Sequence, residues 1–157
     1  MFPLSVVRRL TFEASEPEAL ALRLRKVLAG ELLRKRARVE VCADTVTFIA
    51  GIFRFVSSGN LLGVIGYGSV RIAAETDSIL VEYRLHFLEI ILLSALVVTF
   101  MATVMRAGGL PLQSAIGGGL FFFTFISFGN IFVALARFRN FVNKCVRAAK
   151  EGGELTS

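Results

Sequence analysis

Two long apolar runs in the second half of the chain constrain its fold more than any other feature. The first covers residues 87–105 and the second residues 112–136, and between residues 87 and 136 the only charged side chains are Glu89 and Arg106. A helix of about 20 residues spans a hydrocarbon core of about 30 Å. Each run is long enough to cross a membrane, so we expect two transmembrane helices.

The connection between the two runs contains Gly108, Gly109 and Pro111 and is too short to hold a domain or to cross back. The runs should therefore form an antiparallel helical hairpin. The alternative is a soluble protein in which the hairpin is buried. The 86 residues ahead of the hairpin are too few to cover two such helices on all sides, which favours the membrane.

Composition agrees with an integral membrane protein. Hydrophobic residues make up 55% of the chain and charged residues only 19%, against about 25% in soluble domains. The N-terminus has no basic stretch followed by a short apolar run, so we expect no cleavable signal peptide. Insertion should then depend on the first span.

The basic residues near the ends of the spans predict the orientation. Only Arg106 lies at the hairpin tip, whereas the other side carries Arg71, Arg84, Arg137, Arg139, Lys144, Arg147 and Lys150. Cytoplasmic flanks are enriched in Lys and Arg, so both termini should be cytoplasmic. Cys42 and Cys145 would then lie in a reducing compartment, and we expect neither a disulfide nor a metal site.

Residues 1–86 are predicted to form a small cytoplasmic α+β domain, with one helix against an antiparallel sheet. The helix should cover residues 15–36, with Ser15 as N-cap, Glu18 as its capping-box partner and Pro17 in the first turn. Alternating apolar, β-branched and aromatic residues predict strands at 4–14, 37–43, 45–55, 66–75 and 78–87. Turns are expected at 43–44 and 76–78, and a longer loop at 57–60.

Residues 137–157 are predicted to form a basic amphipathic helix and a tail. One helical stripe carries apolar side chains, namely Phe138, Phe141, Val142, Cys145, Val146 and Ala149. Such a helix either lies in the membrane interface or packs onto its own cytoplasmic domain. The predicted order is thus an α+β domain (1–86), a transmembrane hairpin (87–136) and this C-terminal segment.

Polar residues inside the hairpin are candidates for contacts, because each is costly in lipid unless it is satisfied. Glu89 and Arg137 should lie at similar depth, so an interfacial ion pair is the simplest interpretation of both, and proton handling by Glu89 is the alternative. Asn130 lies about two turns inside the second span and is expected to form a hydrogen bond across helices.

Small residues at four-residue spacing mark expected close contacts between helices. Ala95, Thr99 and Thr103 form one row, and Ser114 with Gly118, or Ala115 with Gly119, form another. Packing within the hairpin and docking of a larger membrane partner both remain open. The second span also carries more bulk than one neighbouring helix can cover, in Phe121, Phe122, Phe123, Phe125, Phe128 and Phe132.

The sequence contains no pattern that predicts catalysis. The single histidine, His86, lies at a membrane boundary and is expected to be an anchor, and no nucleophile, metal or phosphate-binding motif is present. Gly63, Gly66 and Gly68 superficially resemble a dinucleotide fingerprint but are interpreted as turn and bulge glycines. We expect a protein that is not an enzyme and has no cofactor.

The net charge of +6 is best explained by an anionic membrane surface. No aromatic-rich or helix-turn-helix motif accompanies the basic residues, so no nucleic-acid partner is expected. The expected partners are the lipid bilayer and either a membrane protein or a second copy of the chain.

Three segments, AGIFRFVSSGNLLGVIGYGSVRI, VEYRLHF and GNIFVALARFRNFV, together with the two spans, resemble small bacterial membrane proteins that carry a strand-rich cytoplasmic domain ahead of a helical hairpin. The resemblance covers roughly residues 39–146. It implies only the topology. It implies no activity and no catalytic residues. Separately, we expect the chain to be a multi-pass protein of a bacterial inner membrane.

These observations favour a non-enzymatic accessory or scaffolding subunit of a larger membrane protein complex. One alternative is a membrane-surface module that senses a lipid or a ligand. Another is a homo-oligomeric transport component in which Glu89 and Asn130 face a polar path. The residues selected as interface or structural candidates are Glu89, Asn130, Arg137, Gly118, Gly119, Phe138 and Phe141.

Overall fold

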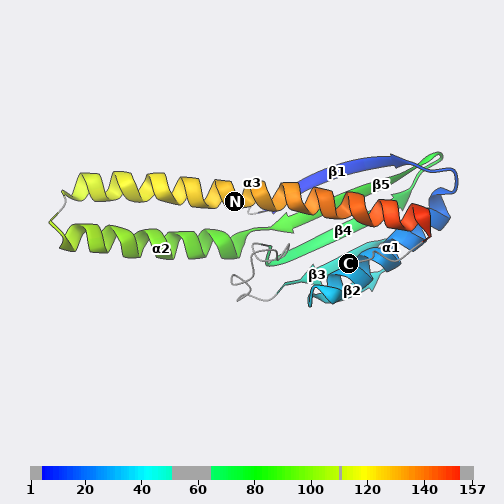
Figure 1. Ribbon diagram of the computed structural model, residues 1–157, viewed down its shortest axis with the longest axis horizontal. Coiled ribbons are helices and arrows are strands. Elements are labelled where there is room, and N and C mark those ends of the chain that lie inside the picture. Colours follow the sequence, from blue (N-terminus) through cyan, green and yellow to red (C-terminus); the bar gives the residue numbers. More distant parts are fainter. Residues whose placement is uncertain (1–4, 51–64, 110, 153–157) are drawn as a thin grey trace.

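The computed structural model describes residues 5–50, 65–109 and 111–152 of the 157-residue chain, and within these ranges it contains five strands and three helices (Figure 1). In chain order they are β1 (Ser5–Glu13), α1 (Pro17–Arg34), β2 (Arg38–Cys42), β3 (Thr45–Ile49), β4 (Tyr67–Ala74), β5 (Ser78–His86), α2 (Leu88–Ala107) and α3 (Leu112–Glu151). The predicted α+β class is confirmed. The loop expected at 57–60, the end of the strand expected at 45–55, and Gly63 lie outside the described residues.

The five described strands form one antiparallel sheet in the order β1-β5-β4-β3-β2. Strands β2 to β5 follow one another as neighbours, and β1 joins the free side of β5. The chain therefore has to cross from one edge of the sheet to the other between β1 and β2, and α1 makes this crossing. The turn predicted at 43–44 is present, because Cys42 pairs with Thr45 across it.

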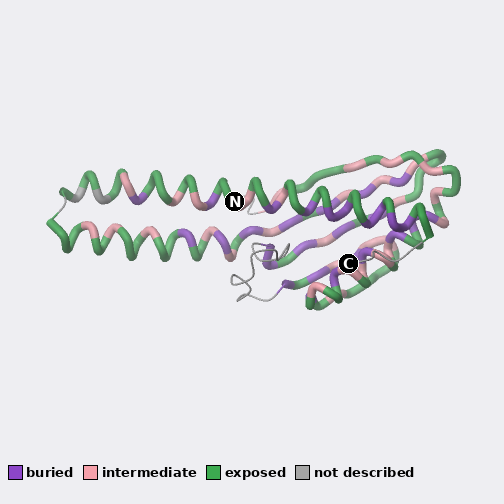
Figure 2. Tube along the Cα trace, viewed as in Figure 1, coloured by how far each residue is buried: buried purple, intermediate pink, exposed green. Residues whose placement is uncertain are grey.

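Buried residues alternate with more exposed ones along β4 and β5 (Figure 2), so one face of the sheet is covered and the other is open. On β5, the side chains that point to the covered face are buried, namely Ile79, Val81, Tyr83 and Leu85. Helix α1 and the second half of α3 supply the cover. The open face carries polar pairs, including Arg9–Glu82 and Arg71–Asp44 at 2.6 Å each. The Arg71 guanidinium lowers the pKa of Asp44 below its usual value, mainly through their hydrogen bond.

Helix α1 buries one stripe at four-residue spacing, formed by Leu20, Leu24, Leu28 and Leu32. The predicted cap is wrong: Glu16 is the N-cap, and no side-chain hydrogen bond caps the helix. Pro17 explains this start, because it occupies the first helical position with a fixed φ and has no N–H that needs a partner.

Two direct connections join the sheet to the long helices. Only Phe87, which is 1% exposed, separates β5 from α2. Helix α3 is continuous over 40 residues, so the predicted C-terminal amphipathic segment is the second half of the same helix that contains the second apolar run. Its first half lies beside α2 and runs in the opposite direction (Figure 1). Gly152 ends it at a φ of +69°, a conformation that favours glycine.

The stripe of α3 predicted from helical spacing lies in the core of the domain. Phe138 is fully buried, with its ring centroid 5.7 Å from Phe48, 5.1 Å from Tyr83 and 5.8 Å from Phe141. Of the two arrangements left open by the sequence, the described residues have the packing onto the chain's own sheet. Burial raises the pKa of the Cys145 thiol in this core to about 12.

The interpretation of Gly68 as a turn or bulge glycine is wrong. Gly68 lies within β4, directly opposite Phe48 of β3 and Leu85 of β5. A Cβ on Gly68 would collide with the Phe48 ring. The Phe48 ring therefore occupies the space that a side chain at residue 68 would fill, and from there it stacks on the Phe138 ring. The need for glycine at residue 68 arises from Phe48 on the neighbouring strand, and the sequence does not show that these two strands pair.

Candidate functional site

The most unusual surface of the molecule is the outside of the pair formed by α2 and the first half of α3. In the most apolar stretch of α2 only 11% of the residues are buried, and in that of α3 only 17%. A core helix of a soluble protein is mostly buried. The exposed large side chains include Leu96, Phe100, Phe121, Phe125, Phe128 and Phe132, all at least 66% exposed. An apolar surface of this extent marks an interaction site or a lipid-facing surface.

Small residues form the seam between the two helices. On α2 the buried positions are Ile90 and Ser94, and among the described side chains in the apolar run of α3 (112–136) they are Gly119, Ser127 and Ala134. A Cβ on Gly119 would lie 3.2 Å from Val98 Cγ1 and 3.9 Å from Ala102 Cβ, so the glycine lets the backbones approach closely. Gly119 is thus placed where the predicted close contact requires it.

The row of small residues expected on α2 is not part of this seam. Ala95, Thr99 and Thr103 are exposed, and each threonine hydroxyl donates to the backbone carbonyl four residues earlier at 2.8 Å. The seam follows the adjacent row, Ile90–Ser94–Val98–Ala102, which has the same four-residue spacing. Gly118 is half-buried and its absent Cβ would lie 4.0 Å from Met105, whereas Ser114 is exposed.

Ser94 and Ser127 were not selected from the sequence. Because Gly119 faces Val98 and Ala102, the antiparallel arrangement puts Ser127, about two turns along α3, level with Ser94 on α2. Both residues are buried, and neither hydroxyl has a hydrogen-bond partner among the residues that the structure describes. The sequence offered one indication of their role: both are small residues at the four-residue spacing of the helix contact, Ser94 in a row with Val98 and Ser127 eight residues after Gly119. At such positions the small size of the side chain matters more than its hydroxyl.

Glu89 and Arg137 do not form the expected ion pair among the described residues. The Glu89 carboxyl lies against Gly66 instead, where an added Cβ would be 2.5 Å from the Glu89 Cδ. Glu89 is half-buried and Arg137 is exposed. Similar depth along two helices was therefore not enough to predict an ion pair, because the position of Glu89 around α2 directs its side chain toward the start of β4.

Asn130 also has a local partner. Its Nδ2 donates to the Ile126 backbone carbonyl at 2.7 Å, within its own helix, so the hydrogen bond across helices predicted for it is not made in this structure. His86 packs against Tyr67 on the open face of the sheet, with ring centroids 5.0 Å apart. Phe138 and Phe141, the remaining candidates, belong to the domain core, and Lys35 lies 6.0 Å from the Phe141 ring centroid.

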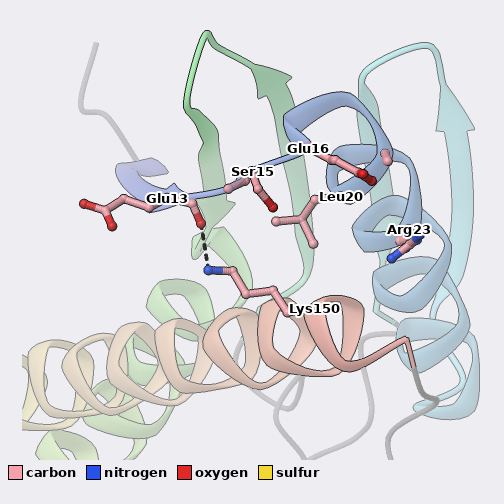
Figure 3. A pocket seen from close by; sticks show the side chains of 8 residues that line it. Glu13, Ser15, Glu16, Leu20, Arg23 and Lys150 are labelled. Atoms are coloured by element: carbon pink, nitrogen blue, oxygen red, sulfur yellow. Dashed lines mark hydrogen bonds between the residues drawn. The ribbon is translucent and has the colours of Figure 1, made fainter.

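A pocket of 260 Å³ lies at the end of the sheet farthest from α2 (Figure 3). It is lined by Glu13, Ala14, Ser15, Glu16, Ala19, Leu20, Arg23 and Lys150. Lys150 Nζ donates to the Glu13 carbonyl at 2.7 Å and so joins the last turn of α3 to the end of β1. Two carboxylates and two cations balance each other in this lining, which suits a structural junction better than a site for a charged ligand.

Across the described ranges, no group of three or more His, Cys, Asp or Glu side chains is placed to hold a metal ion. No protein-family model, curated protein or solved structure matches the chain. The chemistry of the molecule's own surfaces therefore provides the argument for its function.

Proposed function

We propose that the chain is a membrane-anchored accessory or scaffolding subunit of a larger membrane protein assembly, and that it is not an enzyme. In this proposal, α2 and the first half of α3 cross the membrane as a hairpin. Both termini and the sheet lie in the cytoplasm, as the basic residues on that side favour. The exposed apolar surface of both helices supports this arrangement, because lipid or another membrane protein would cover it.

The observation that carries the scaffolding role is the pair of direct connections between the helices and the sheet. Phe87 is buried between β5 and α2, and α3 continues without a break into the domain core at Phe138. A domain tethered by a flexible linker would rotate freely. A domain fixed through two adjacent elements keeps one orientation relative to the hairpin, which suits the presentation of a surface to a neighbouring subunit.

Helix α2 also has an outward row that a neighbouring helix fits. Ala95, Thr99 and Thr103 are exposed, and the two threonine hydroxyls donate to backbone carbonyls of their own helix. This row therefore offers a smooth surface without an unpaired polar group, as helix contacts in membranes require. The transport alternative has less support, because Glu89 lies against Gly66 and Asn130 bonds its own helix.

Site-specific photocrosslinking tests the subunit proposal. A photoreactive side chain at Thr99 should give one adduct of fixed mass in cells, whereas the same group at Phe125, on the lipid-facing side of α3, should give none. An adduct of twice the chain mass would show self-association in place of a different partner. The absence of any protein adduct at Thr99, together with recovery of a clean monomer in several mild detergents, would reject the subunit proposal.

The topology needs its own test. A cysteine at Ala107, in a Cys42→Ser background, should react with a membrane-impermeant maleimide from outside intact cells, since Cys145 is buried. A reporter that works only in the cytoplasm should be active when fused after Ser157, and a reporter that works only on the other side of the membrane should be inactive there. Labelling of Ala107→Cys from the cytoplasm would overturn the orientation.

A further inference from the structure

The open face of the sheet ends, on the side of the hairpin, in one continuous row of side chains. Residues that pair directly across an antiparallel sheet point to the same face. In the register of the five strands this row, the rim, consists of Ser5, His86, Tyr67, Ile49 and Arg38. The strands run roughly along the direction of the hairpin, and β5 leads directly into α2 (Figure 1). The rim is therefore the part of the open face that lies beside the start of the hairpin.

Three of the five side chains of the rim are apolar or aromatic. Ile49 is 50% exposed and Tyr67 is 39% exposed, and the ring centroids of Tyr67 and His86 lie 5.0 Å apart. Tyrosine and histidine each present an apolar body with a polar tip. Such side chains are favoured at the boundary between lipid and water, where one end is apolar and the other is wet.

The charges on the open face change with distance from the hairpin. The rim contains Arg38, which is exposed and in no ion pair among the described residues, and it contains no acidic residue. The next row holds one charge of each sign, Arg84 and Glu40. The row beyond it carries the two ion pairs of the open face, each at 2.6 Å. An unpaired guanidinium beside aromatic rings suits lipid phosphates, whereas balanced ion pairs suit water.

The rim also lies at the right height for lipid headgroups. His86 comes one residue before Phe87, where the first apolar run begins, and this step is about 3.4 Å along a strand. The polar layer of a bilayer extends about 5–8 Å beyond the hydrocarbon on each side. With the first apolar run beginning at the hydrocarbon boundary, His86 and its strand partner Tyr67 fall inside this layer.

We propose that His86, Tyr67, Ile49 and Arg38 form an interfacial belt through which the open face of the sheet rests on the headgroup layer of the bilayer beside the hairpin. Ile49 and the two rings contact the boundary between headgroups and acyl chains, and the planar Arg38 guanidinium binds phosphate oxygens. The inference rests on the proposed function, since headgroups lie beside the rim only if α2 crosses the membrane. It goes further by assigning lipid, and not a protein, to this end of the open face.

Because the chain contains no tryptophan, one introduced tryptophan is a unique fluorescent probe. Tyr67→Trp and, as a second rim variant, Ile49→Trp would each be placed in the full-length chain in lipid nanodiscs of phosphatidylcholine and phosphatidylglycerol. A nitroxide on the lipid headgroup should quench both tryptophans more strongly than a nitroxide deep on the acyl chain, and acrylamide in the water should quench them weakly. Ala73→Trp is the matched control, on the same strand and face but six residues, or about 20 Å, farther from the hairpin. Acrylamide should quench this control strongly, and neither nitroxide should.

A third position separates this inference from the proposed function. Leu96 is 68% exposed on α2, so Leu96→Trp should be quenched by the acyl-chain nitroxide. If it is, but both rim variants respond as Ala73→Trp does, the belt is rejected and the membrane hairpin stands. Rim tryptophans shielded from both nitroxides and from acrylamide would mean that protein covers the rim, which also overturns the belt. A Leu96→Trp that the acyl-chain nitroxide does not quench would reject the proposed function itself.

Discussion

The two halves of α3 place the same residue type in opposite surroundings. In the apolar run (112–136), Phe125 is 70% exposed and Phe132 is 75% exposed, whereas Phe138, six residues beyond Phe132, is fully buried. Both halves belong to one unbroken helix and both are rich in phenylalanine. The difference is what lies beside them: only α2 beside the apolar run, and a five-stranded sheet with α1 beside the rest of the helix.

This difference separates two roles of apolar side chains. Around Phe138 they stabilise the fold of the chain itself, because their neighbours are other parts of the same chain. Around Phe125 and Phe132 most of their surface has no neighbour within the described chain, so their contribution depends on what surrounds the molecule. Substitutions in the two halves should therefore have unequal effects on stability.

The largest effect is expected at Phe138. Phe138→Ala should lower the free energy of unfolding by about 3–5 kcal/mol, because it leaves a cavity among Phe48, Tyr83 and Phe141. Phe132→Ala, the matched change in the exposed half, should cost less than about 0.5 kcal/mol in detergent. Equal losses, measured by circular dichroism during denaturation, would contradict the division of α3 into two environments.

The next effect is expected at two glycines of the sheet domain. Gly68→Ala should cost about 1–3 kcal/mol, because its Cβ would collide with the Phe48 ring and approach Leu85. Gly30→Ala, in the interior of α1 with nothing within 4 Å of an added Cβ, should instead stabilise the protein by about 0.5–1 kcal/mol. Thermal melts of both variants give the comparison, and a tolerated Gly68→Ala would mean that the ring does not occupy this position.

A similar contrast is expected along the seam, with a smaller effect because one helix pair is involved. Gly119→Leu should separate α2 from α3 and lower stability by about 1–2 kcal/mol, since even a Cβ there lies 3.2 Å from Val98. Gly117→Leu, on an exposed position with open space around it, should have little effect. Disulfide trapping between cysteines at Val98 and Gly119 would report the helix contact directly, and failure to form that disulfide would argue against this seam.

The smallest effect is expected on the open face. The pKa of Asp44 is lowered in the folded protein by Arg71, so the pair stabilises the fold above the carboxyl's ordinary pKa of 3.8, and this contribution is lost as the pH falls through the lowered value. Asp44→Asn should therefore be slightly less stable than the unmodified chain at pH 7 and equally stable below the lowered pKa. Because the pair is exposed, the difference should also shrink in high salt.

The sequence predicted the elements better than their partners. Alternation of apolar residues located β2, β4 and β5 to within a few residues, and helical spacing identified the buried stripe from Phe138 to Ala149. Periodicity depends only on nearby residues, so it shows which side chains share a face. It does not show which distant element covers that face.

The misassigned residues share this cause. Ala95 and Ser94 lie on adjacent rows with identical spacing, and only the position of α3 decides that Ser94 is in the seam. Gly68 required knowledge of Phe48 on a neighbouring strand, and Glu89 required knowledge that Gly66 lies beside it. The Ser15 cap failed for a local reason, because Pro17 fixes the helix start two residues later.

The continuity of α3 has a mechanical consequence. At 1.5 Å per residue the helix is about 60 Å long, and the part from Arg137 to Glu151 extends about 22 Å. Any change in its inclination is passed undiminished to the sheet packed on it, so a tilt of 10° would displace the Glu151 end sideways by about 4 Å. The tilt of a membrane-spanning helix responds to bilayer thickness. If α3 crosses a membrane as proposed, a change in bilayer thickness would therefore move the sheet sideways on the cytoplasmic side, as a lever does.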